Sequence, residues 1–327
     1  MKNVWLATAL TLSLLAAPSA WAADTDGTSS LLTSWLEVQE DEPTVWRQAW
    51  LQAEAVHSRV LDQSFYARMT PADKAAAIAQ ALESDMSDFP ARMKELADLQ
   101  AQWSADVAAV KATMVRELGQ GPGVDVHVYF AMSPQKAVAG TIDGRPAVVV
   151  NARHLLPYQP DATRLLLTRA LLVHVSSAWA KDRQETALAP TVAGQLQAEG
   201  LTAWAAGRVV PGAAVASVLS VTPAQAQMLE KARGAIAREL LTALDLGSPA
   251  QLDRFFGPKA PEGWPPATGR YVGLLVTQEV ARELGGPAVV RMSRKTFAER
   301  ARVILKRLAT GAATEPKPSA PGAGPQA

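Results

Sequence analysis

The chain has no cysteine among its 327 residues. Disulfides, a lipid-modified cysteine anchor and a thiol nucleophile are therefore excluded, and stability has to come from the hydrophobic core. An excess of charge of one sign is also missing, because 32 Lys and Arg residues are balanced by 31 Asp and Glu residues. A near-neutral chain lacks the electrostatic footprint of nucleic-acid binding, so we expect no nucleic-acid partner. The length and the 48% hydrophobic content suit one large or two small globular domains.

The N-terminus lacks an apolar run long enough to cross a bilayer. Lys2 precedes an apolar stretch from Val4 to Ala17, about 14 residues where a membrane-spanning helix needs roughly 20. Ala20-Trp21-Ala22 matches the small-residue cleavage site of a secretory signal peptide. We therefore expect residues 1–22 to be a signal peptide cleaved after Ala22, and the mature protein to be periplasmic or secreted without a membrane span. A retained membrane anchor is the alternative.

Apolar residues spaced three to four apart predict helices over most of the chain. From about Ser29 to Gly119 the chain is expected to be helical, with apolar stripes over 44–61 and 90–118. A second set of helices is expected after mid-chain. These later helices are predicted at about 161–181, 191–206, 223–244, 269–284 and 294–309.

In mid-chain the period of the apolar residues changes to two. Val124 to Phe130 alternates, as a half-buried strand does. Asp143-Gly144, a pair preferred in tight hairpin turns, separates two further apolar stretches at 137–142 and 146–150. The expected fold class is therefore α+β, mostly helical, with a small sheet of about three strands. The expected divisions are an N-terminal helical region at 23–119, a second domain at 120–309 and a disordered Ala-, Pro- and Gly-rich tail at 310–327.

The segment around His174 has the layout of a zinc-peptidase helix in which two positions are replaced. In the motif His-Glu-x-x-His two imidazoles one turn apart bind zinc, and the Glu deprotonates the attacking water. Here the frame is His174-Val175-Ser176-Ser177-Ala178. Val175 cannot move a proton, and Ala178 cannot bind a metal. Glu199 lies in an otherwise apolar helical segment, where a buried carboxylate needs a partner, and His174 is the expected partner.

These motifs resemble a gluzincin-type family of predicted zinc-dependent proteases, a poorly characterised family with a domain of unknown function. Glu199-Gly200-Leu201 resembles the Glu-Gly-Leu-Ala motif of the family's second helix, and Val210-Pro211-Gly212 resembles the turn after it. Gly140 to Val150 resembles the family's hairpin. Gly269 to Gly273 resembles a later Tyr-x-x-Gly helix, with the glycine one residue early. The likeness spans roughly residues 124–284.

The resemblance implies a zincin-like helical core within residues 120–309. It makes His174 the first zinc ligand and Glu199 the third, and it places Tyr271 in the cleft as a weakly matched stabiliser of an oxyanion. Two protein ligands are too few for a tight zinc site, and loss of the general base typically costs roughly 10²–10⁴-fold in rate. The resemblance therefore implies a pseudoenzyme that holds no metal cofactor and acts by binding a peptide or protein.

Two alternatives remain. An active metal-dependent peptidase would need a rearranged zinc site, formed by His174, Glu199 and either His154 or His127. Each of the last two is by base rate more often an ordinary surface or loop histidine. Alternatively, the protein is a helical scaffold unrelated to peptidases, in which His174 and Glu199 are an incidental pair. The geometry of the His174 and Glu199 side chains discriminates between these hypotheses. If the two side chains lie on unconnected faces, the scaffold is favoured over both peptidase-like hypotheses.

Overall fold

The computed structural model describes residues 25–39, 42–85, 88–119, 121, 123–182, 185, 190–257 and 263–311. The expected signal peptide and nearly all of the expected disordered tail lie outside these ranges. The described chain is mostly helical with one small sheet, which confirms the predicted α+β class. No helix in the described ranges combines the length and the apolar character that a membrane crossing requires.

Helices form the N-terminal region, as the apolar spacing predicted. The stripe predicted over 44–61 is divided at His57, where the backbone (φ −104°, ψ 7°) leaves the helical range. The longest helix has 30 residues and ends at Gly119, whose positive φ of 73° closes the last turn. These helices are α1 (Ser29–Val38), α2 (Pro43–Val56), α3 (Ser58–Gln63), α4 (Pro71–Asp85) and α5 (Phe89–Leu118).

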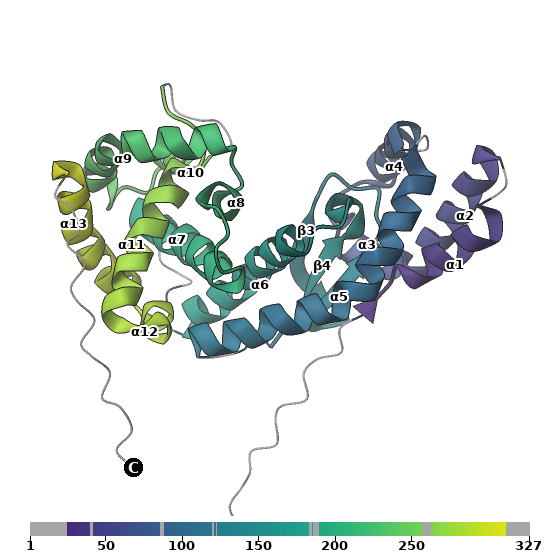
Figure 1. Ribbon diagram of the computed structural model, residues 1–327, viewed down its shortest axis with the longest axis horizontal. Coiled ribbons are helices and arrows are strands. Elements are labelled where there is room, and N and C mark those ends of the chain that lie inside the picture. Colours follow the sequence, from purple (N-terminus) through teal and green to yellow (C-terminus); the bar gives the residue numbers. More distant parts are fainter. Residues whose placement is uncertain are drawn as a thin grey trace, which may run out of the picture.

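The sheet lies between the two groups of helices and has four strands in the order β1-β2-β4-β3 (Figure 1). The predicted hairpin is present: β3 and β4 pair antiparallel, and Asp143 and Gly144 between them adopt φ values of 52° and 81°. β2 pairs parallel with β4, and the two-residue β1 pairs parallel with β2. The strands are β1 (Thr25–Asp26), β2 (Asp125–Tyr129), β3 (Ala137–Ile142) and β4 (Arg145–Asn151).

The last residue of β4 orders the loop that precedes β3. The Asn151 side-chain amide donates to the carbonyls of Ala131 and Ser133 at 2.9 and 3.1 Å, and its oxygen accepts from the Ala131 amide at 3.1 Å. The buried Asn151 thus replaces backbone pairing that the loop lacks. A 3₁₀ turn, η2 (Ala152–Leu155), follows directly.

The C-terminal half is a group of helices packed beside α5 (Figure 1). Thr222, Ser248 and Ser293 each cap a helix start by accepting a backbone N–H. Three of the helices are short and were not predicted. The helices are α6 (Pro160–Asp182), α7 (Val192–Val209), α8 (Val215–Leu219), α9 (Pro223–Ala243), α10 (Pro249–Phe256), α11 (Thr268–Leu284), α12 (Gly286–Arg291) and α13 (Arg294–Thr310).

A buried carboxylate fastens α6 to α5. Asp106 on α5 is only 1% exposed. It accepts hydrogen bonds from the Tyr158 hydroxyl and from Arg164 Nε, both at 2.7 Å. Because a buried charge is costly unless it is paired, these two partners hold α6 in place.

Helices α7 and α11 touch through their backbones. A Cβ atom placed on Gly200 would lie 2.3 Å from the Gly273 carbonyl oxygen, and one placed on Gly273 would lie 2.7 Å from the Leu196 carbonyl oxygen. Both glycines belong to segments that carry the gluzincin resemblance. Close helix packing is therefore a sufficient physical reason for glycine at these two positions.

The α7–α11 contact predicts opposite effects for two substitutions in one helix. Gly200→Ala forces the helices apart and should lower the free energy of unfolding by about 1–3 kcal/mol. Gly207→Ala is the matched control, because its Cβ would meet only Val218 Cγ2, at 3.8 Å. It should stabilise the protein by about 0.5–1 kcal/mol through higher helix propensity. Urea unfolding followed by circular dichroism measures both effects, and equal effects would contradict the packing described here.

Candidate functional site

His174 on α6 faces the sheet. Its Nε2 lies 2.7 Å from the Ala147 carbonyl oxygen of β4, so this nitrogen carries the proton and donates it. Val175, in the position of the catalytic Glu, is buried in the core. The side chain of Ala178 lies outside the described residues. His174, which stands at the first ligand position of the zinc frame, thus uses its Nε2 to bond α6 to β4.

Glu199 on α7 has a cationic partner. Its Oε2 accepts from Arg270 Nε of α11 at 2.7 Å, and its Oε1 accepts from Gln195 at 3.3 Å. The side chains of Glu199 and Arg270 are 24% and 33% exposed, so water partly screens the ion pair. The expectation that this carboxylate needs a partner was sound, but the partner is Arg270 and not His174.

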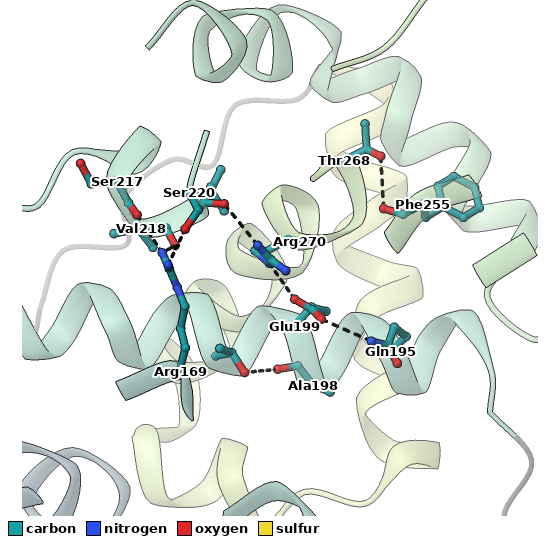
Figure 2. Close-up of polar contacts among 12 residues, drawn as sticks. Arg169, Gln195, Ala198, Glu199, Ser217, Val218, Ser220, Phe255, Thr268 and Arg270 are labelled. Carbon is teal, nitrogen blue, oxygen red and sulfur yellow. Dashed lines mark hydrogen bonds and ion pairs between the residues drawn. The ribbon is translucent and has the colours of Figure 1, made fainter. Parts of the chain in front are cut away.

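A second arginine approaches the same carboxylate from α6. Arg169 donates to the carbonyls of Ser217 and Val218 at 2.8 and 2.5 Å and to the Ser220 hydroxyl, around the C-terminal end of α8. Figure 2 shows Arg169 on one side of Arg270 and Glu199 on the other. Burial lowers the pKa of Arg169 to about 10; the Arg270 charge adds to this effect, and Glu199 opposes it. At neutral pH the Arg169–Glu199–Arg270 cluster therefore holds two positive charges and one negative charge.

The structure does not join His174 to Glu199. The His174 imidazole bonds to the sheet, whereas Glu199 bonds to Gln195 and Arg270. On α6, Arg169 and His174 are five residues apart, which places them about 140° apart around the helix axis. The side of α6 that interacts with Glu199 is therefore not the side that carries His174.

Tyr271 is buried and turned toward α9. Its hydroxyl donates to the Glu230 carboxylate, and burial together with this hydrogen bond raises the pKa of Tyr271. Its neighbour Arg270, which the resemblance did not single out, is the α11 residue that reaches Glu199.

The two other candidate histidines have other neighbours among the described residues. His154 on η2 contacts the Ser133 carbonyl through Nε2 at 2.9 Å. His127 on β2 stacks on the Tyr129 ring, with a distance of 6.4 Å between centroids. Within the described ranges, no three His, Asp or Glu residues form a group that could hold a metal. The residues at the expected zinc position do not fit the ion, because the carboxylate is paired with a guanidinium and the imidazole with a carbonyl.

A cavity of about 440 Å³ adjoins the Arg169–Glu199–Arg270 cluster. It lies between α6, η2 and α8, and Arg169 belongs to both the cluster and the cavity wall. Lys136 and His154 are the other basic residues of the wall. None of the described residues that line the cavity is an Asp or Glu.

Comparison with protein families, with curated proteins and with solved structures finds no match to this chain. The gluzincin resemblance therefore remains a prediction.

A separate buried carboxylate lies among the N-terminal helices. Glu54 on α2 is 8% exposed, and its Oε2 has no hydrogen-bond partner among the described residues. Burial raises its pKa from 4.5 to about 7, although Lys74 and Tyr66 nearby oppose the shift. The folded state binds this proton more tightly than the unfolded state does. The contribution of Glu54 to the free energy of unfolding is therefore fully present below pH 4.5, and it is lost as the pH rises through about 7.

Glu54→Gln should remove this part of the pH dependence. The wild-type free energy of unfolding should fall relative to that of the variant between about pH 4.5 and pH 7, by at most ~3 kcal/mol. Above pH 7 the variant should be the more stable protein. Glu37→Gln, at an exposed position on α1, is the control and should keep the wild-type profile. Parallel wild-type and Glu54→Gln profiles in urea unfolding would contradict the prediction.

Proposed function

We propose that the chain is an exported, non-catalytic protein that acts by binding a peptide or protein, and that it has the sequence frame of a zinc peptidase without the assembled zinc site. The observation that carries the non-catalytic part of this proposal is the 2.7 Å ion pair between Glu199 and Arg270. In this ion pair the Glu199 carboxylate, which would be the third zinc ligand, is already bonded to a guanidinium. Replacement of the general base by the buried Val175 supports the same conclusion.

Electrostatics also disfavours a dication beside Glu199. Zinc is held by neutral imidazoles and anionic carboxylates that have lone pairs directed at the metal. Here the guanidinium groups of Arg169 and Arg270 leave an excess positive charge around the only carboxylate of the cluster. Like charges at short range repel, most strongly where burial lowers the dielectric screening. Such a site favours an anionic ligand over a metal ion.

Metal content and peptidase activity test this proposal. The purified protein, dialysed against zinc-containing buffer, should hold much less than one zinc per chain by mass spectrometry. It should also leave unblocked peptides intact. Stoichiometric zinc that is lost in both His174→Ala and Glu199→Gln would overturn the proposal. A chelator-sensitive peptidase activity that depends on His174 would instead establish the rearranged zinc site.

Export is the second part of the proposal. We expect the mature protein in the periplasmic or extracellular fraction of its host to begin at Ala23, after removal of residues 1–22. Intact-mass measurement of that fraction tests this expectation. Protein that retains the first 22 residues and sediments with membranes would support the retained anchor instead.

The separate partners of His174 and Glu199 favour a second candidate function. In a helical scaffold unrelated to peptidases, His174 would only join α6 to the sheet, and Glu199 would only join α7 to α11. The two candidates differ in ligand binding, because a pure scaffold needs no recognition site for a peptide.

A further inference from the structure

The cavity between α6, η2 and α8 carries positive charge, and none of the described residues that line it is a carboxylate that could balance this charge. Lys136 is exposed, and no carboxylate among the described residues pairs with its ammonium group. Among the described residues, Arg169 bonds to carbonyl and hydroxyl oxygens. His154 uses Nε2 to contact a carbonyl. A concave wall with cations and no acid concentrates anions.

Arg169 is held in position before any ligand arrives. Its hydrogen bonds to Ser217, Val218 and Ser220 fix the guanidinium against the end of α8. A guanidinium has five N–H donors, so three acceptors leave donor capacity unused. A charged group that is already ordered loses little entropy on binding, which favours affinity.

A buried hydroxyl on the same wall has no hydrogen-bond partner in the part of the chain that the structure describes. Thr163 on α6 is 1% exposed, and its Oγ1 has no hydrogen bond to any described residue. A buried hydroxyl without a partner is costly and uncommon. Because Oγ1 is itself shielded from solvent, a ligand in the cavity reaches it only if the Thr163 side chain turns toward the cavity.

Another part of the wall is apolar. Leu155, Leu156, Pro157 and Leu166 line the cavity beside the cationic groups. Its volume of about 440 Å³ falls within the range of small-ligand sites, roughly 300–1,000 Å³. The lining therefore matches a carboxylate that is attached to an apolar body.

We propose that this cavity binds the free C-terminal carboxylate of a peptide whose last side chain is apolar, with Lys136 and Arg169 as the carboxylate-binding residues. The proposal rests on the proposed peptide-binding function and names the end of the peptide that is recognised. The carboxylate lies between the ammonium and the guanidinium, as charge-assisted hydrogen bonding favours. The last side chain packs on the leucines of η2 and α6.

Paired peptides test the proposal on the full mature protein. The probes are an N-acetylated alanine-alanine-leucine tripeptide with a free carboxylate and the same tripeptide with a C-terminal amide. Calorimetry should give an affinity for the free acid that is about tenfold or more above that for the amide. The difference should shrink as salt is added. Equal affinities would overturn the proposal.

Charge variants at an exposed lysine provide the residue-level test. Lys136→Gln should weaken binding of the free acid about fivefold and leave the amide unchanged, as expected for loss of one partly exposed ion pair. Lys136→Glu should weaken it further. Lys231→Gln on α9 is the matched control, because it removes the same charge from an exposed position outside the cavity. All three variants should unfold at the wild-type temperature, and equal losses at positions 136 and 231 would overturn the assignment.

Octanoate tests whether the cavity recognises the carboxylate of a peptide or that of any small apolar acid. If octanoate displaces the tripeptide at equal concentration, the site recognises small apolar acids, and the assignment to peptides is overturned. Chelator-sensitive hydrolysis of the unblocked peptides would contradict the proposed non-catalytic function, whereas equal binding of acid and amide would contradict this cavity alone. The two failures are thus distinguishable.

Discussion

The contact between α7 and α11 is the constraint on which the C-terminal half depends. Gly200 and Gly273 have no side chains, and the two helix backbones therefore meet directly. This short separation brings Glu199, the residue before Gly200, within 2.7 Å of Arg270, three residues before Gly273. The ion pair is a consequence of the packing, because a wider helix separation would move the two groups apart.

The ion pair matters more for charge balance than for stability. Both side chains are partly exposed, and pairs of this kind contribute modestly to the free energy of unfolding. The pair does, however, neutralise a carboxylate within an otherwise apolar helix. It leaves Arg169 as the uncompensated cation, fixed to the end of α8 and facing a cavity whose described lining contains no acid. In the sequence Glu199 suggests an acidic site, but in the structure the two arginines beside it give the cluster an excess of positive charge.

Local signals made the main elements predictable. The Asp143-Gly144 turn was predictable because positive φ favours few residue types, and α5 because its apolar stripe covers many turns. The helices α8, α10 and α12 were missed because five to eight residues are too few to reveal a period of 3.6. The partner of Glu199 was missed because Arg270 lies 71 residues away, and no local pattern encodes a pairing over that distance.

Helix α5 is long enough to contact both the N-terminal helices and the C-terminal helices. A helix of 30 residues measures about 45 Å at 1.5 Å per residue. In its first half Gln100 bonds to Ser29 of α1, and at its end Gly119 lies against Pro287 of α12. The length of α5 thus determines the distance between α1 and α12. Inserting one turn into it would shift the N-terminal helices by about 5 Å relative to the cavity.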